Sequence, residues 1–119
     1  MSSEIEKQMI DQLLDKIRSS KHRKYNLVKG HSNNLETLTE LGYTDSVVLD
    51  IILSLKSEEC LSSFEKDKGG YKGYVFEFGR VLCSKEVYIK FRVLFEDNTC
   101  HVICISFHFA KYELRYRFK

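Results

Sequence analysis

The chain has 119 residues and a formal net charge of +2, because its basic and acidic residues are nearly equal in number. A chain of this length buries one sizeable core, so residues 1–119 are predicted to form a single domain. No apolar run approaches the roughly 20 residues that span a bilayer, and the acidic start "MSSEIEKQMI" does not resemble a signal peptide. We therefore expect a cytoplasmic protein without membrane contact.

The first half of the chain has helical periodicity. Apolar residues recur at helical spacing through residues 3–19, and the next segment, "RKYNLV", is typical of a short strand. The segment "NNLETLTELGY" predicts a helix over residues 33–42, with Asn33 as its N-cap and Gly42 as its stop signal. A mostly apolar helix is predicted over residues 44–55.

The second half changes to a period of two. Strands are predicted over residues 74–83, 86–96 and 100–109, and a basic and aromatic tail follows over residues 110–119. Helices followed by strands in hairpin order indicate an α+β domain, with the N-terminal helices packed on one face of a small antiparallel sheet.

The loop between the last two strands determines their register. A three-residue loop at 97–99 sets Phe91 opposite Ile105 and keeps the facing core residues apolar. A two-residue loop sets Phe91 opposite Cys104 instead. We therefore expect the three-residue loop.

That register also brings polar side chains together on the other face of the sheet. The expected cross-strand pairs are Arg92 with Cys104, Lys90 with Ser106, and Tyr88 with His108. Cations stabilise the charge of a phosphate in its transition state, and histidine is the side chain that takes and gives protons near neutral pH. The alternative is an ordinary solvated sheet face.

The four cysteines do not indicate a metal site. They contain no C-x-x-C pair, and on a strand Cys100 and Cys104 lie about 13 Å apart, too far to share one ion. We expect reduced thiols, no metal and no cofactor.

Four segments, "LETLTELGYT", "LDIILSL", "EVYIKFRV" and "ICISFH", carry a resemblance to a known family. Together they resemble the MqsR family of bacterial toxins, which are small ribonucleases of toxin–antitoxin systems with a fold akin to RelE and YoeB. The resemblance covers about residues 35–118 and implies a RelE- or barnase-like ribonuclease architecture. A departure is Ser62, which stands where members often carry a lysine.

The resemblance implies an mRNA interferase, an endoribonuclease that cleaves single-stranded RNA without metal. The 2′-hydroxyl attacks the neighbouring phosphate and leaves a 2′,3′-cyclic phosphate. His108 is the expected acid or base, Tyr88 the residue that contacts the phosphate or a base, and Lys90 and Arg92 the cations of the transition state, with Glu77 as a further catalytic candidate.

Further residues are expected to bind RNA. They are Arg80, Ser106, Tyr112, Arg115, Tyr116 and Arg117. The tail is either an aromatic and cationic strip for single-stranded RNA or an edge strand whose cations oppose aggregation. Expected partners are mRNA and a cognate antitoxin, with the ribosome as a further candidate. The alternative function, favoured by Ser62, is a catalytically weak or inactive module of the same fold that binds RNA or a partner.

Overall fold

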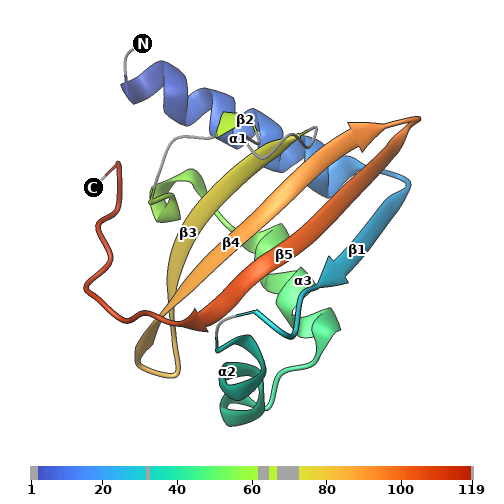
Figure 1. The fold of residues 1–119 in the computed structure, drawn as a ribbon. Helices are drawn as coiled ribbons and strands as arrows, with labels where there is room; N and C mark the ends of the chain where they lie inside the picture. The colour runs from blue at the N-terminus through green and yellow to red at the C-terminus, as the bar shows by residue number, and fades with distance from the viewer. Residues whose placement is uncertain (1–2, 32, 62–64, 67–72, 119) are drawn as a thin grey trace.

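A computed structural model describes residues 3–31, 33–61, 65–66 and 73–118 of the chain. Within these residues it has the predicted α+β fold, with helices behind a five-stranded sheet of order β1-β5-β4-β3-β2 (Figure 1). The elements are α1 (Ser3–Ser19), β1 (Arg23–Leu27), α2 (Asn34–Leu41), α3 (Asp45–Ser54), a short 3₁₀ helix η1 (Ser57–Glu59), β2 (Glu65–Lys66), β3 (Tyr74–Leu82), β4 (Lys85–Glu96) and β5 (Thr99–Phe109).

The sheet is mixed rather than wholly antiparallel. Strands β3, β4 and β5 form the predicted antiparallel meander, but β1 pairs in parallel with β5, from Arg23 opposite Cys100 to Leu27 opposite Cys104. The expectation of a purely antiparallel sheet is therefore wrong. Parallel neighbours need a long connection, which the segment from α2 to β4 supplies.

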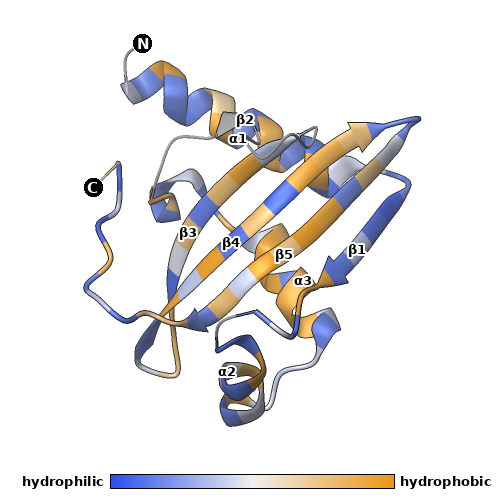
Figure 2. Cartoon of the chain, viewed as in Figure 1, coloured by the Kyte–Doolittle hydropathy of each residue, from blue (hydrophilic) through white to orange (hydrophobic). Residues whose placement is uncertain are grey.

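The core lies between the helices and one face of the sheet. Alternate residues of β3 and β4, such as Phe76, Phe78 and Phe91, are fully buried against α1 and α3, and their rings stack at centroid distances of 5.3–5.7 Å. Figure 2 shows that hydrophilic residues interrupt the apolar ones along these strands, as expected for a sheet with one packed face. No helix of the described residues is long and apolar enough to cross a membrane.

The register of the β4–β5 hairpin differs from the prediction near its turn. Glu96 pairs with Thr99 across a two-residue turn, and Phe91 faces Cys104. The turn residues Asp97 and Asn98 both have positive φ, 51° and 60°, a conformation that Asp and Asn tolerate and that suits the twist of a hairpin. The predicted three-residue loop and the pairing of Arg92 with Cys104 are therefore wrong.

A β-bulge restores the predicted register further along the hairpin. The pairing shifts between Phe91 and Lys90, so that Ile105 is the extra residue of β5. Lys90 then faces Ser106 and Tyr88 faces His108, as predicted.

The bulge is held by the buried side chain of Asn34. Beyond β1 the outer edge of β5 has no neighbouring strand in the described residues, and α2 lies beside it (Figure 1). Asn34 is fully buried. Its amide nitrogen donates to the carbonyl oxygens of Val28 at 2.7 Å and Ile105 at 2.9 Å, and its oxygen accepts from the Phe107 amide at 2.9 Å. These hydrogen bonds satisfy backbone groups that have no partner on a neighbouring strand.

The ends of α2 test two further predictions. Gly42 ends the helix in a left-handed conformation with φ 71°, as predicted. Asn33 is the N-cap residue, as predicted, but its side chain makes no capping hydrogen bond. The neighbouring asparagine, Asn34, faces the sheet instead.

Candidate active site

The sheet face opposite the helices brings Tyr88 and His108 together. They are cross-strand partners on β4 and β5, and their ring centroids lie 5.4 Å apart with an interplanar angle of 36°. His108 is 9% exposed. The imidazole is therefore held between strand, tyrosine ring and the chain that follows β5, which restricts its orientation.

The backbone determines which nitrogen of His108 carries a proton. Its Nδ1 lies 3.0 Å from the carbonyl oxygen of Phe109. A carbonyl oxygen only accepts, so this contact is a hydrogen bond when Nδ1 is protonated. In the neutral ring the free lone pair is then on Nε2, which makes Nε2 the atom that can take a proton.

Glu77 joins the pair through Tyr88. The Tyr88 hydroxyl donates a hydrogen bond to the Glu77 carboxylate from the neighbouring strand β3. Burial, and then this hydrogen bond to a negative group, raise the pKa of Tyr88 well above its ordinary value. Tyr88 therefore stays protonated near neutral pH and acts as a donor, not as a base.

The two predicted cations follow on the same face of β4. Lys90 lies between Glu77 on β3 and Ser106 on β5, and Arg92 lies two residues further along, between Val75 and Ile103. Successive residues on one face of a strand are about 6.6 Å apart. Within the described part of the chain no carboxylate makes an ion pair with Lys90. The face thus presents positive charge beside the histidine.

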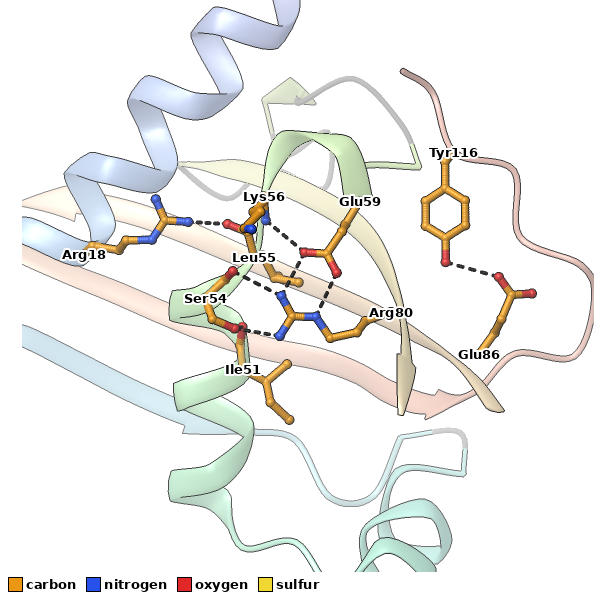
Figure 3. Close-up of polar contacts among 9 residues, drawn as sticks. All are labelled: Arg18, Ile51, Ser54, Leu55, Lys56, Glu59, Arg80, Glu86 and Tyr116. Carbon is orange, nitrogen blue, oxygen red and sulfur yellow. Dashed lines mark hydrogen bonds and ion pairs between the residues drawn. The ribbon is translucent and has the colours of Figure 1, made fainter. Parts of the chain in front are cut away.

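Arg80 lies on the opposite, helix-covered face. Its guanidinium makes two hydrogen bonds of 2.8 Å to the Glu59 carboxylate, and it also donates to the Ser54 hydroxyl at 2.6 Å and the Ser54 carbonyl at 3.1 Å (Figure 3). The structure does not bring Arg80 to the other site candidates. Its contacts join β3 to the end of α3 and to η1.

Arg80→Ala is expected to lower the free energy of unfolding by about 2 kcal/mol, because it leaves the half-buried Glu59 carboxylate without its charged donor. Urea denaturation measures the change. The matched control is Lys85→Ala, which removes the exposed ion pair with Glu40 and should cost no more than about 0.5 kcal/mol. Equal losses in the two variants would contradict this role for Arg80.

The tail divides into an anchoring part and an exposed part. The Tyr116 hydroxyl donates to Glu86 at 3.1 Å (Figure 3), and the Arg117 guanidinium donates to Glu6 of α1 at 2.6 Å. Tyr112 is 85% exposed and Arg115 is exposed too. Residues 110–118 contain no strand, so the edge-strand interpretation of the tail is wrong.

The tail and the Tyr88–His108 pair line an open pocket of about 280 Å³. Its lining residues are Tyr88, His108, Ala110, Lys111, Tyr112 and Leu114. The pocket opens beside the candidate acid–base residue, so the tail forms part of the site.

Comparison with known proteins adds no relative. No protein-family model, curated protein or solved structure matches the chain.

Two further expectations concern metal ligands and the cysteines. The residues that the structure describes contain no cluster of three or more His, Cys, Asp or Glu side chains placed to hold a metal ion. Cys60, Cys100 and Cys104 are buried free thiols, and Cys83 is exposed. Burial raises the pKa of Cys104 to about 12. Ser62, where the family resemblance expects a lysine, lies outside the described residues.

Sequence reasoning missed Glu86 and Leu114, which position the tail. Glu86 accepts from the Leu114 amide at 3.4 Å as well as from the Tyr116 hydroxyl. Gly79 was the available signal, because a glycine inside a strand marks a close approach of another segment. A Cβ at Gly79 would lie 2.6 Å from Leu114 Cδ1 and 2.9 Å from the Tyr116 oxygen.

Proposed function

We propose that the chain is a metal-independent endoribonuclease that cleaves single-stranded RNA through attack of the 2′-hydroxyl on the adjacent phosphate. The observation that carries this proposal is the held imidazole of His108, whose Nδ1 faces a carbonyl oxygen and whose ring lies beside Tyr88. On the same sheet face, Lys90 lies about 6.6 Å and Arg92 about 13 Å further along β4 than Tyr88, and both supply positive charge.

The reaction needs one base, one acid and charge stabilisation. In the proposed mechanism, Nε2 of His108 takes the proton from the 2′-hydroxyl as its oxygen bonds to phosphorus. The bond from phosphorus to the 5′-oxygen then breaks, and this oxygen takes a proton from solvent water. The products are a 2′,3′-cyclic phosphate and a 5′-hydroxyl. Lys90 and Arg92 stabilise the extra negative charge on the phosphorane oxygens.

Tyr88 is a positioning residue in this proposal. Its ring packs beside the imidazole, and its only proton is already donated to Glu77. Glu77 in turn fixes the direction of the tyrosine hydroxyl. The pair keeps His108 in one orientation before RNA binds, which lowers the entropy cost of reaching the reactive geometry.

Tyr88→Phe is expected to slow single-turnover cleavage about tenfold, because it keeps the ring contact and loses the bond to Glu77. Tyr88→Ala removes both and should slow it further. Since the pKa of Tyr88 is raised, its hydroxyl stays protonated between pH 5 and 9, and wild type and Tyr88→Phe should share one shape of pH–rate profile over this range. A pH-dependent rise or fall of the rate in only one of the two proteins would contradict the positioning role.

The biological setting of the proposal rests on resemblance. The segments "EVYIKFRV" and "ICISFH" resemble the MqsR family, and they contain Tyr88, Lys90, Arg92 and His108. By this resemblance the chain is the toxin of a type II toxin–antitoxin system. It acts on mRNA in the cytoplasm, and a cognate antitoxin restrains it.

A second candidate function is a module of the same fold that binds RNA or a protein partner without catalysis. Ser62, in place of the lysine that members of the family often carry, favours it. The placement of the acidic Glu77 opposite Lys90 also reduces the positive charge of the face. Such a module needs the cations but not His108.

Induced expression in bacteria distinguishes the two functions. The wild-type chain and His108→Ala are expressed at matched protein levels while growth and the 5′ ends of cellular RNA are followed. The ribonuclease predicts growth arrest with new 5′-hydroxyl ends, both lost in the variant. Arrest without new ends, or equal toxicity of the variant, would contradict the enzyme and favour the binding module.

A further inference from the structure

The strongest feature outside the acid–base pair is the pocket that the tail builds beside it. We infer that this pocket binds one nucleobase of the RNA next to the cleaved phosphate, with Tyr112 as its stacking surface. The inference rests on the proposed function, because it takes RNA as the substrate, and it adds to the site a determinant of substrate binding.

The lining of the pocket selects the kind of group that enters it. Ala110, Leu114 and the rings of Tyr88, His108 and Tyr112 provide apolar and aromatic contact, and Lys111 provides the positive charge. Burying a phosphate among such side chains is costly, whereas a nucleobase stacks on aromatic rings whatever its sequence. With a volume of about 280 Å³, the pocket is smaller than the sites that typically bind drug-sized ligands.

The position of the pocket connects it to the proposed chemistry. Tyr88 and His108 form its wall, and Lys90 lies on the same face of β4, about 6.6 Å further along the strand than Tyr88. A base in the pocket therefore leaves its phosphate on the cationic part of the face, within reach of the histidine. The base thus lies in the apolar pocket, and the phosphate lies on the adjacent cationic surface of β4.

The tail is held firmly enough to serve as a pocket wall. Glu86 binds both the Leu114 amide and the Tyr116 hydroxyl. Burial, then the bond to Glu86, raise the pKa of Tyr116 to about 12, so this donor persists at neutral pH. Gly79 allows Leu114 and Tyr116 to approach the sheet closely. Against these anchors, Tyr112 remains 85% exposed.

The experiment uses the full chain and a short single-stranded RNA of mixed sequence that carries 2-aminopurine, whose fluorescence falls when it stacks. Binding is measured with a 2′-O-methyl version of this RNA, which lacks the attacking hydroxyl and cannot be cleaved, and KM and kcat are measured with the unmodified RNA. Tyr112→Ala should weaken RNA binding and raise KM about tenfold, with kcat within about twofold and the quenching reduced. Tyr112→Phe, which keeps the ring, should match the parent.

Glu86→Ala tests whether the fixed position of the tail matters. It removes the acceptor for the Leu114 amide and the Tyr116 hydroxyl but does not change the Tyr112 side chain itself. We expect it to reproduce the loss of affinity seen in Tyr112→Ala. Unchanged affinity in Glu86→Ala would overturn the pocket as the binding site.

The outcomes separate this inference from the proposed function. Cleavage by wild type, with Tyr112→Ala equal to it in KM and quenching, would overturn the nucleobase pocket and leave the ribonuclease intact. Binding and quenching that depend on Tyr112, without any cleavage by wild type, would support the pocket and overturn the ribonuclease. Equal losses in Tyr112→Ala and Tyr112→Phe would overturn stacking as the cause.

Discussion

His108→Ala should slow RNA cleavage by about 10²–10⁴-fold, the range that a positioned general acid or base contributes. The Nδ1 contact with the Phe109 carbonyl leaves Nε2 as the proton acceptor, and alanine supplies none. Single-turnover rates with purified protein and saturating RNA measure the loss without interference from product release. RNA affinity should fall much less than the rate, because the cations of β4 and the other residues of the pocket remain.

His101→Ala is the matched control for this experiment. His101 lies on the same strand, β5, and is the partner of Leu94 on β4 and Lys24 on β1. It does not line the pocket beside Tyr88. Cleavage by His101→Ala should stay within about twofold of wild type. A comparable loss in both histidine variants, or full activity of His108→Ala, would contradict the assignment of the proton transfer to His108.

Asn34→Ala should lower the free energy of unfolding by about 3 kcal/mol. The substitution leaves the Val28 carbonyl, the Ile105 carbonyl and the Phe107 amide without their side-chain partner in a buried place. A buried polar group that loses its partner costs about 1–3 kcal/mol, and relaxation of the bulge recovers part of the total. Urea denaturation measures the difference.

Asn33→Ala provides the control, since Asn33 is exposed and makes no capping bond. Its expected effect is within about 0.5 kcal/mol. The bulge precedes His108 by three residues, so Asn34→Ala should also slow cleavage at temperatures where the variant is still folded. A variant as stable as Asn33→Ala would contradict the role of Asn34 in holding β5.

Hydrophobic periodicity predicted most of the fold. The alternation in β3, β4 and β5 predicted three antiparallel strands, and the helical spacing of residues 3–19 corresponds to α1. The facing of Tyr88 and His108 was also predicted, although from a turn that is one residue too long. The β-bulge at Ile105 adds the residue that the real turn lacks, so the two differences cancel beyond it.

The missed features depend on contacts between distant segments. The parallel docking of β1 on β5 leaves no periodic signal in either strand. Asn34 follows the predicted N-cap Asn33 in sequence, and only the edge of β5 that has no neighbouring strand explains its burial. Arg80 alternates in phase with the buried Phe78, which places it on the helix side, where Glu59 pairs with it.

The ends of the cleaved RNA test the central claim most directly. Purified protein is incubated in EDTA with a single-stranded RNA, and with the same RNA carrying a 2′-deoxynucleotide at the position found to be cut. The account predicts a 2′,3′-cyclic phosphate and a 5′-hydroxyl from the first substrate and no cut at that position in the second. A 5′-phosphate product, or cleavage next to the 2′-deoxynucleotide, would contradict it.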